Sequence, residues 1–566
     1  MKQFVECVPN FSEGRDLAKI KQITIAIEAV EGITLLDIDP GKDTNRTVVT
    51  FVGSVENVEE AAFQAIATAA DVIDMRNHSG AHARMGATDV CPFVPVSSVT
   101  AKDCVELSHR VAERVGKELS IPVYLYENSA QNEERKSLPN IRAGEYEGLS
   151  IKLKDPHWKP DYGPAKFNAK SGATVMGSRE FLIAYNINLN TRDQRLATDI
   201  AFELREKGRS KRIPNPDSPN LLDGKIVRDE NGKAVIIPGL FKDVKGVGWY
   251  IDEFKRAQIS INFNNYKVST IHDVFDKACE LAIERGIRVT GSELVGLIPK
   301  EALLMAGRHY LKKQRRTTAV PATDIIECAL QSLGLNDLYP FKPEEKIVEF
   351  AVGQSTGKLS GLTSDGFVDE LSSNSPAPGG GSVAALAGSL GAALVSMVAA
   401  LTHEKKGFEA SQDEMDAMGN KAQEIKDRLS FLIDEDTNAF NTVMDANRLP
   451  SNSDEEKIAK RKAVLAANKY AIEIPLEAAE LSLSVLEIAN ELVKKGNPNS
   501  VSDVGVAGEV ALAAVRGACM NVLINLSDVK DKRYTNRKKK KVDELLNEAP
   551  KLERKIFRQT LKIIEG

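Results

Sequence analysis

Cysteine and histidine are both scarce in this chain of 566 residues. None of the six cysteines stands in a C-x-x-C pair, so the sequence offers neither a zinc knuckle nor the paired spacing of a disulfide framework. Most of them lie among apolar residues, where a free thiol behaves as a small hydrophobic side chain. We therefore expect a reducing compartment, the cytoplasm.

A large net charge is also missing. The 75 basic residues nearly balance the 80 acidic ones, which leaves a net charge of −5 and no reason to expect a nucleic-acid partner. The basic run RKKKK at 537–541 is the exception. Such a short run at a helix start is usually a solvated face.

Long apolar stretches are rare as well. The first residues, MKQFVECVPNF, alternate like a strand and lack the apolar region of a signal peptide. Residues 383–401 are nineteen uncharged residues, which is long enough to cross a bilayer. They are mostly Ala, Gly and Ser, which insert weakly and also suit closely packed helices of a soluble bundle. We expect the bundle and no membrane partner.

The secondary-structure pattern changes once along the chain, whose length indicates two to four domains. Residues 1–350 alternate short β-rich runs with amphipathic helices, which predicts α+β packing. A stretch rich in Gly, Pro, Lys and Asn, 155–180, divides them into two subdomains, 1–178 and 179–350. The expected strands are 4–8, 34–38, 47–52, 123–126, 181–188 and 257–263, and the expected helices are 18–30, 58–73, 101–117, 191–207 and 273–285.

The second half is predicted to be entirely helical. Residues 351–362, AVGQSTGKLSGL, have the composition of a flexible linker, and 363–566 contain no convincing strand. A capping box, Ser453 with Glu456, predicts one helix start, and Gly-Asn-Pro at 496–498 predicts the end of a helix that begins near residue 476. The sequence therefore predicts α+β packing followed by an all-α helical bundle.

One insertion stands out in the second subdomain. Residues 209–239 are rich in Pro, Asp, Asn and Gly, and contain DENG at 229–232 between short apolar runs. This pattern is typical of a β-hairpin or an extended loop.

Two of the seven histidines stand within five residues, in NHSGAHARMGATDVCPF at 77–93. This segment reads as a loop between a helix and an apolar strand, and loops on a rigid scaffold are where catalytic groups concentrate. His82 or His78 could act as a general base near neutral pH, or both could simply hydrogen-bond the loop. H-x-x-x-H in a glycine-containing loop is only a weak zinc signal.

A second polar cluster lies in LLDIDPGKDTNRTVVTFVG at 35–53. We expect its polar residues at a turn between two strands, where carboxylates could orient a histidine or could equally be turn residues. These residues are Asp37, Asp39, Asp43, Asn45 and Arg46.

The helical half carries one carboxylate on an apolar face. On the helix around 425–444, the 3.6-residue period puts Asp436 at the centre of an apolar stripe, while Asp434, Glu435 and Asn438 point elsewhere. A buried carboxylate is costly and its pKa tends to rise, so Asp436 is a candidate site residue. The alternatives are a structural ion pair and a cap for a neighbouring helix. The stripe consists of Leu429, Leu432, Ile433, Phe440 and Val443.

Two loops rich in small residues open helices in this half. SPAPGGGSVAAL at 375–386 could present free N–H groups to an anion, but it lacks the G-K-[ST] ending of a nucleotide-binding loop. GNPNSVSDVGVA at 496–507 is the second such loop.

Taken together, the motifs of residues 1–350 resemble the formiminotransferase domain of the formiminotransferase-cyclodeaminase family, in the family's order and over nearly the whole segment. The resemblance implies two α/β subdomains with a folate tunnel between them. The matching segments are VECVPNFSEG (5–14), the Asp39 turn, GAHARMGATDVCPF (80–93), DYGPAKFNAKSGATV (161–175), NINLN (186–190), GWYIDE (248–253), GSELVGLIPKEAL (291–303) and FKPEEKIVEF (341–350).

The resemblance places the family's catalytic histidine on His82, within G-x-H-x-R-M-G. Asp39 is the expected partner that orients the imidazole, and Lys166 and Lys170 are expected to face the anionic tail of folate. In the second folate contact Leu240 stands where the family has a basic residue, and the segment before it is longer than the family's pattern. The implied folate-binding residues are Gly163, Pro164, Ala165, Lys166, Phe167, Asn168, Ala169, Lys170, Ser171, Gly172, Gly239, Leu240 and Phe241.

The implied transfer is chemically sensible. N5 of tetrahydrofolate attacks the formimidoyl carbon of N-formimidoyl-L-glutamate, so a base must take the N5 proton and an acid must protonate the departing glutamate nitrogen. One histidine can do both in turn.

The two glycine-rich loops, the Asp436 helix and MNVLINL at 520–526 resemble the cyclodeaminase domain of the same family. The resemblance makes Asp436 the catalytic acid that protonates departing ammonia when N10 closes onto the formimidoyl carbon, and 5,10-methenyltetrahydrofolate is the product. It implies a step in histidine degradation, tetrahydrofolate as co-substrate (polyglutamylated), no metal, and a homo-oligomer built from dimers. The alternatives are a transferase whose helical half serves only oligomerisation, and a folate-binding protein without activity.

Overall fold

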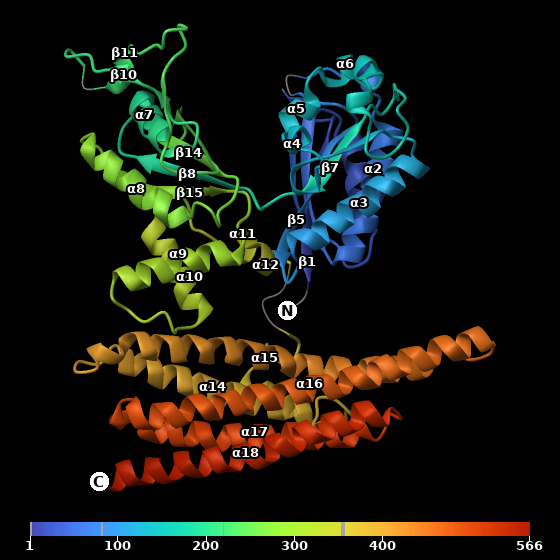
Figure 1. Ribbon diagram of the computed structural model, residues 1–566, viewed down its shortest axis with the longest axis vertical. Coiled ribbons are helices and arrows are strands. Elements are labelled where there is room, and N and C mark those ends of the chain that lie inside the picture. Colours follow the sequence, from blue (N-terminus) through green and yellow to red (C-terminus); the bar gives the residue numbers. More distant parts are fainter. Residues whose placement is uncertain (1–2, 43, 81–82, 219, 353–356) are drawn as a thin grey trace. The chain divides into compact units, whose positions relative to one another are not determined.

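The computed structural model (Figure 1) describes every residue except 1–2, 43, 81–82, 219 and 353–356. The chain packs into two compact units. The first contains residues 1–302 and 333–354, and the second contains residues 303–332 and 355–566. The boundaries expected from the sequence, at 178 and at the linker 351–362, stay a prediction. The packing places residues 303–332, which precede this linker, in the second unit.

A seven-stranded sheet is the core of the N-terminal part of the first unit. Its order is β1-β4-β2-β5-β7-β6 with β3 beside β4, and β7 runs parallel to β5 and β6. The strands are β1 (Phe4–Cys7), β2 (Asn10–Phe11), β3 (Thr34–Gly41), β4 (Arg46–Gly53), β5 (Thr88–Ser97), β6 (Val123–Leu125) and β7 (Thr174–Ser178). The helices of this part are α1 (Leu17–Glu28), α2 (Val55–Val72), α3 (Ala101–Glu118), α4 (Glu133–Lys136), α5 (Leu138–Arg142) and α6 (Glu145–Lys152).

The stretch expected to divide the two subdomains is not wholly irregular. Its last residues form β7, all five of them buried, between two neighbouring strands of the first sheet. The glycines of this stretch hide the strand from sequence analysis. The expected strands 4–8, 34–38, 47–52 and 123–126 are confirmed within one to three residues.

A four-stranded antiparallel sheet, β13-β14-β8-β15, forms the next part of the first unit. Two of these strands were not predicted, because their glycines weaken the β signal. In β13 the glycine has a packing reason: a Cβ on Gly248 would overlap the backbone of Thr198 in α7. The elements are α7 (Gln194–Leu204), β8 (Ile183–Leu189), β13 (Val244–Ile251), β14 (Arg256–Phe263), α8 (Ile271–Glu284), β15 (Val289–Val295), α11 (Pro343–Lys346) and α12 (Val348–Ala351).

The insertion between α7 and β13 contains two short strand pairs, which agrees with the predicted β-hairpin, and its DENG sequence forms a turn. Asp229 accepts hydrogen bonds from the N–H groups of Asn231 and Lys233, and Gly232 has a positive φ of 76°. The elements are β9 (Arg209–Ser210), β10 (Arg212–Ile213), η4 (Leu221–Asp223), β11 (Lys225–Ile226) and β12 (Ile236–Ile237), paired as β10–β11 and β9–β12.

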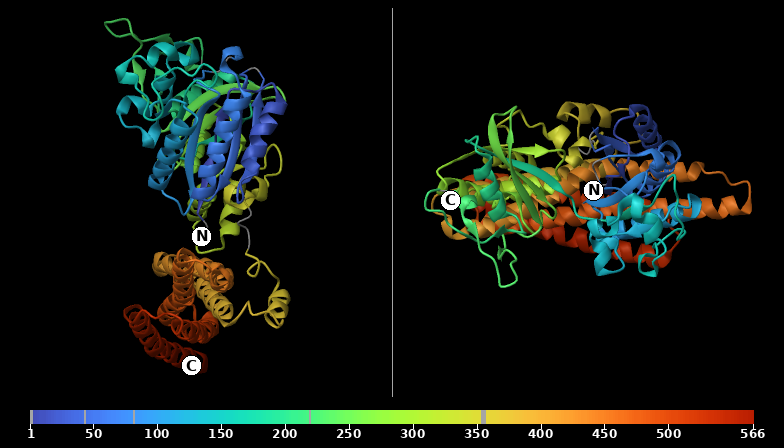
Figure 2. Two further views of the ribbon diagram at one scale, coloured as in Figure 1. Left: turned by 90° about the vertical axis from the view of Figure 1, so that its right-hand side faces the viewer. Right: turned by 90° about the horizontal axis from the view of Figure 1, so that it is seen from above.

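Every regular element among the described residues of 355–566 is a helix, which confirms the all-α prediction. Long helices run side by side, as the orange and red ribbons of Figure 1 and Figure 2 show. They enclose one apolar core. The helices of this unit are α9 (Lys300–Lys313, from residue 303), α10 (Ala322–Leu333), α13 (Ser364–Leu371), α14 (Gly380–His403), α15 (Gln412–Arg448), α16 (Asp454–Lys495), α17 (Val501–Leu526) and α18 (Lys532–Glu565).

The capping box at Ser453 and Glu456 and the helix end at Gly496 are confirmed, but the predicted helix start near 476 is wrong. One helix, α16, runs from 454 to 495 straight through Pro475. Proline cannot donate a hydrogen bond to the carbonyl of Ala471 four residues earlier. Asn525 of α17 does so instead, with its side-chain nitrogen 2.7 Å from that oxygen. The partner on another helix explains why the proline does not end α16.

Both α14 and α17 are long and apolar enough to cross a membrane by length and composition alone. In α14 more than half of the most apolar window is buried inside the helical unit. Its glycines allow close packing: Gly388 faces Ser482 of α16, and Gly391 faces Ala507 of α17. This packing favours a core helix of the bundle.

The segment between α9 and α10 is fastened to α15 by hydrogen bonds. The Asp416 carboxylate accepts from the hydroxyl of Thr317 and from both the N–H and the hydroxyl of Thr318, each at 2.7 Å. Asn420 donates to the same carboxylate at 3.2 Å. Ala319 is buried against Gly419, where a Cβ would be too close. These contacts explain why 303–332 belongs to the helical unit.

Candidate active sites

The histidine loop follows a short turn at Met75–Asn77 and leads into β5. His82 lies outside the described residues, so its role stays a prediction. His78 forms a hydrogen bond at the loop, which was one of the two alternatives from the sequence: its Nε2 lies 2.9 Å from the carbonyl oxygen of Asn45. The Asn45 side chain donates to the carbonyl of Ser79 and accepts from the N–H of Gly14. Asn45 therefore ties the start of the loop to the β3–β4 turn.

The other end of the loop is also fixed. The buried carboxylate of Asp89 accepts the N–H of Met85 at 2.9 Å and pairs with the guanidinium of Arg142. The sequence placed Asp89 in the loop without a role of its own, whereas the structure places it in β5. Its burial beside an arginine from α5 is a tertiary feature that the local sequence does not show.

An open cavity of about 440 Å³ lies beside this loop. The buried side chain of Arg84 forms the floor of this cavity. The Arg84 Nε donates to Nδ1 of His78, and the other guanidinium nitrogens pair with Glu147 at 2.6 Å and Glu145 at 2.9 Å. The hydrogen bond from Arg84 lowers the pKa of Glu147. The two glutamates stand about sixty residues from the loop and were not predicted. The cavity is lined by His78, Ser79, Gly80, Arg84, Gly144, Glu145 and Glu147.

The predicted folate segment 163–172 lies against the loop's exit. Gly86 and Gly172 form an isolated β-bridge, and Ala87 donates to the carbonyl of Ser171 at 2.8 Å. Gly163 and Gly172 both have positive φ, and a Cβ at either would overlap a backbone carbonyl oxygen. Two motifs far apart in the sequence are thus brought together.

The side chains of this segment differ in availability. Lys170 donates to the carbonyl of Asp71 at 2.8 Å, and Phe167 packs against the ring of Tyr146. Lys166 is exposed and has no ion-pair partner among the described residues. The remaining exposed positions are Gly163, Pro164, Ala165 and Ala169, and the partly or fully buried ones are Asn168, Ser171 and Gly172.

Asp39 does not lie at a turn, which corrects the prediction for it and for Asp37. Both belong to β3, where Asp39 pairs with Val48 of β4 and is exposed. β3 ends at Gly41, and Arg46 begins β4. Asp39 makes no hydrogen bond to the described part of the histidine loop, so its orienting role stays a prediction. Asp43 lies outside the described residues.

The second predicted folate contact lies on the end of α7. The N–H groups of Gly239, Leu240 and Phe241 donate to the carbonyls of Glu206, Glu203 and Leu204. A Cβ on Gly239 would overlap the carbonyl oxygen of Arg205. Leu240 is 54% exposed. It is thus an apolar surface residue at the position where we expected a basic residue from the family pattern.

In the helical unit Asp436 lies where α15 meets the start of α14. The Ser382 hydroxyl donates to the carboxylate at 3.2 Å and to the carbonyl of Ile433 at 2.9 Å. The Ser382 N–H also bonds to the carboxylate, so Asp436 caps α14, whose own N-cap Gly379 has no side chain to do so. The cap, one of the alternatives from sequence, is therefore present. Burial raises the pKa of Asp436 and outweighs these hydrogen bonds, which lower it.

The small residues of the glycine-rich loop allow the start of α14 to come close to the Asp436 carboxylate. A Cβ on Gly381 would overlap the Asp436 carboxylate, and Gly380 faces the side-chain amide of Asn521 on α17. The loop 375–386, the Asp436 helix and the segment 520–526 thus meet at one place. Ser382 and Asn521 are the residues that sequence analysis did not single out there, because isolated polar residues in a glycine-rich loop or an apolar helix carry no periodic signal.

The second small-residue loop lies elsewhere. Its Asn497 donates through its N–H to Thr402 and is also bonded by Lys405, at the opposite end of α14 from Gly380. The predicted stripe also holds only in part: Leu429, Leu432 and Ile433 are buried, but Phe440 is exposed because the last turns of α15 are largely solvent-facing. Asp434 points away from Asp436 as predicted and accepts the N–H groups of Leu359 and Ser360.

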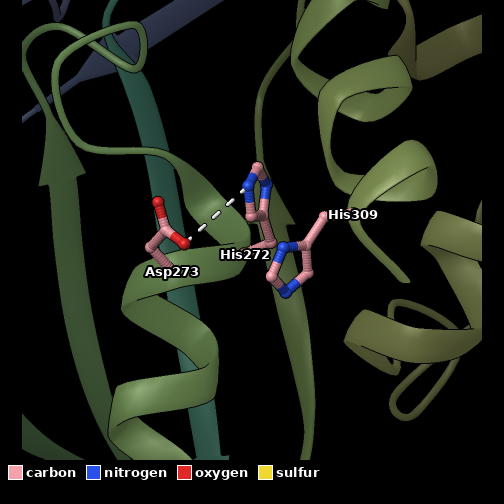
Figure 3. Close-up of side chains that lie close together, drawn as sticks. All are labelled: His272, Asp273 and His309. Carbon is pink, nitrogen blue, oxygen red and sulfur yellow. Dashed lines mark ion pairs between the residues drawn. The ribbon is translucent and has the colours of Figure 1, made fainter. Parts of the chain in front are cut away.

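Figure 3 shows three further side chains that sequence analysis did not single out. His272 and Asp273 begin α8, with the histidine Nε2 3.9 Å from the carboxylate. His309 belongs to α9 of the other compact unit, so the three residues define no metal site within either unit.

Three sequence models of known families match the chain. Residues 4–179 match the "Formiminotransferase domain, N-terminal subdomain", residues 184–353 the "Formiminotransferase domain", and residues 363–544 the family described as "Formiminotransferase-cyclodeaminase".

Curated relatives cover the whole chain and each half separately. The formimidoyltransferase-cyclodeaminase of Mus musculus is 42% identical over 97% of both chains. The glutamate formimidoyltransferase of Streptococcus pyogenes is 38% identical over 55% of this chain and 94% of its own. The methenyltetrahydrofolate cyclohydrolase of Methylorubrum extorquens is 38% identical over 35% of this chain and 96% of its own.

Proposed function

The chain belongs to the formimidoyltransferase-cyclodeaminase family, and we propose that it catalyses two consecutive steps of histidine degradation on folate. The transferase part moves the formimidoyl group from N-formimidoyl-L-glutamate to N5 of tetrahydrofolate. The helical unit then converts 5-formimidoyltetrahydrofolate into 5,10-methenyltetrahydrofolate and ammonia. The observation that carries the second step is the partly buried Asp436 carboxyl group, held at the start of α14 by Ser382.

In the transfer step, His82 takes the proton from N5 and later gives it to the departing glutamate nitrogen. The fixed ends of its loop support this role: Asn45 holds Ser79, and Asp89 holds Met85. Positioning of a catalytic group relative to its substrate is a main source of catalytic rate. Asp39 is the proposed partner of the imidazole.

The folate segment beside the loop supports binding of the co-substrate there. We propose that residues 163–172 contact the pterin and aminobenzoyl groups in a tunnel between the two subdomains. Lys166 is the better partner for the glutamate tail, polyglutamylated or not, because Lys170 already bonds the carbonyl of Asp71. Gly239, Leu240 and Phe241 supply the second contact, with an apolar side chain at its centre.

In the cyclodeamination step, N10 attacks the formimidoyl carbon and gives up its proton, and the amino nitrogen leaves as ammonia. The leaving nitrogen needs a proton, which Asp436 donates. A free aspartate is almost fully ionised near neutral pH and is a poor proton donor. Burial raises the pKa of Asp436 and so increases the fraction that carries a proton.

A second activity of the helical unit is favoured by one observation, its 38% identity to a methenyltetrahydrofolate cyclohydrolase. Water addition to the methenyl bridge opens it to a formyl group. The two reactions share the one-carbon unit between N5 and N10. We expect slow loss of methenyl absorbance after ammonia release if the helical unit also hydrolyses its product.

We also propose that the chain forms a homo-oligomer in the cytoplasm. Val383, Leu390 and Met397 are exposed on α14 at a spacing of seven residues, which places them on one face of the helix. An exposed apolar face of this kind supports burial against another copy. All six cysteines are free, which suits a reducing compartment. Light scattering of the purified chain tests the oligomer.

The direct test of the helical unit is to supply 5-formimidoyltetrahydrofolate without the glutamate substrate. Equal initial rates of ammonia release and methenyl formation support the proposed function. Absence of ammonia release from a folded preparation that still transfers the formimidoyl group would leave only the transferase alternative.

A further inference from the structure

The inserted segment encloses a small cavity on one side of α7. Its volume is about 80 Å³, and three of its six lining residues are arginines. Neither half of the proposed function assigns a role to it. The lining residues are Phe202, Arg205, Arg209, Ser210, Arg212 and Leu222.

One of the three arginines is fully neutralised. Arg209 is buried and donates to Asp199 at 2.7 Å and Glu203 at 2.8 Å. The same two carboxylates also pair with Arg285, at 2.7 and 2.6 Å. The two positive charges of Arg209 and Arg285 thus neutralise the two negative charges of Asp199 and Glu203.

The other two arginines bond mainly to neutral groups. Arg205 donates to the carbonyls of Gly208 at 3.0 Å and Gly246 at 3.3 Å, and its guanidinium lies 3.8 Å from the centroid of the Phe202 ring. Burial lowers the pKa of Arg205, with no carboxylate to offset it.

Arg212 donates to the carbonyls of Leu222 at 2.8 Å and Gly224 at 2.7 Å. The charge of Arg212 helps to lower the pKa of Asp223, but that carboxylate pairs with Arg195 and accepts from the hydroxyl of Ser218. Neither Arg205 nor Arg212 has an ion-pair partner among the described residues. Two guanidinium groups that contact no carboxylate directly therefore border the cavity.

We propose that this cavity binds one compact oxyanion, with the size of a phosphate ion or a single carboxylate group. The volume equals that of about two to three water molecules, which excludes a nucleotide or a folate ring. A guanidinium has five N–H donors, of which Arg205 and Arg212 each use two in the bonds above. The carbonyl contacts hold both guanidinium groups in place, so little conformational freedom is lost on binding.

The test is a calorimetric titration of the full-length protein with inorganic phosphate at constant ionic strength, repeated with glutamate. The variant is Arg212→Gln, which removes one charge from the cavity. Arg228→Gln is the matched control, because Arg228 belongs to the same insertion, donates to the carbonyl of Gly232 and does not line the cavity. Arg212→Lys retains the charge without the planar guanidinium and serves if the glutamine variant does not fold.

We expect one phosphate per chain in the wild-type protein and in Arg228→Gln, and at least tenfold weaker binding in Arg212→Gln. In Arg212→Lys, binding should weaken by a smaller factor. The same dependence on Arg212 with glutamate instead of phosphate would identify a carboxylate as the occupant. Equal affinity in wild type and the Arg212 variants, or no saturable binding of either anion, overturns the proposal.

Discussion

At Asp436, burial and hydrogen bonding act on the pKa in opposite directions, and burial prevails. The carboxyl group also caps α14, so a catalytic and a structural role could both depend on it. Because its pKa is raised in the folded state, the native protein holds this proton more tightly than the unfolded chain. Ionisation of Asp436 therefore destabilises the fold as pH rises through the interval between the two pKa values.

Asp436→Asn separates the two roles. Asparagine keeps an oxygen that accepts hydrogen bonds from Ser382 but has no proton to donate. We expect glutamate release at the normal rate, accumulation of 5-formimidoyltetrahydrofolate, and a loss of methenyl formation of roughly 10²-fold or more. The melting temperature, measured on the same preparation, should change little. A stable variant that makes methenyl product at the wild-type rate would remove Asp436 from the mechanism.

Ser382→Ala tests how Asp436 is held. The hydroxyl of Ser382 lowers the pKa of Asp436, so its removal should raise that pKa. Since the protonated acid is the active form, the fall of cyclodeamination with rising pH should move to higher pH. Ser389→Ala is the control, because that hydroxyl on the same helix bonds to Ser430 and Lys426 instead. An unchanged pH profile in a variant that still folds would contradict the positioning role of Ser382.

His82→Ala tests the transferase half. Loss of the proposed proton shuttle should reduce glutamate release by roughly 10²-fold or more. Cyclodeamination of supplied 5-formimidoyltetrahydrofolate should remain near normal, because the helical unit carries its own acid. His157→Ala, an exposed histidine paired with Glu134, is the matched control. Wild-type glutamate release by the His82 variant would refute the assignment.

Among single residues, the sequence indicated Asp436 because a helix repeats its environment every three to four residues. No such period marks Ser382, or the two glutamates that pair with Arg84 from sixty residues away. For Asp39, β3 continues through Asp-Pro-Gly, residues that usually indicate a turn. Pairing with β4 overrides that local preference.

At the scale of elements, the helical character of 363–566 was predictable, but the start of α16 and the glycine-containing strands β7, β13 and β15 were not. Where α16 crosses Pro475, Asn525 of another helix supplies the missing hydrogen bond. In β13, Gly248 is required by the close approach of α7, while in sequence it reads as a strand breaker. In both cases the deciding contact comes from an element distant in sequence.

The attachment of the 303–332 segment to α15 depends on Asp416. Burial raises the pKa of this carboxylate, but hydrogen bonds from Thr318 and Thr317 outweigh burial and leave it lowered. Its contribution to stability is therefore present above the unfolded pKa and is lost as pH falls. Asp416→Ala leaves three donors of Thr317 and Thr318 without this acceptor, and we expect a loss of roughly 1–3 kcal/mol.

The measurement for Asp416→Ala is the melting temperature of the full-length protein near neutral pH. Glu424→Ala removes an exposed pair with Lys421 on the same helix and should change stability little. If both variants have the melting temperature of the wild-type protein, Asp416 does not stabilise the attachment of residues 303–332 to α15.

At the scale of the whole molecule, the change from α+β to all-α was evident from the sequence, because hydrophobic periodicity differs between the two halves. The membership of 303–332 in the helical unit was not, since its helices look like any other helices of the first half. Packing alone distinguishes them. A segment that precedes the linker in sequence therefore belongs to the second compact unit.

The central claim is that one chain performs transfer and cyclodeamination in sequence. The direct measurement is a single incubation of the full-length protein with N-formimidoyl-L-glutamate and tetrahydrofolate, in which glutamate, ammonia and methenyl absorbance are followed together. We expect glutamate to appear first, and ammonia and methenyl absorbance to follow with equal initial rates. Glutamate release without ammonia, or ammonia without methenyl absorbance at any time, would contradict the account.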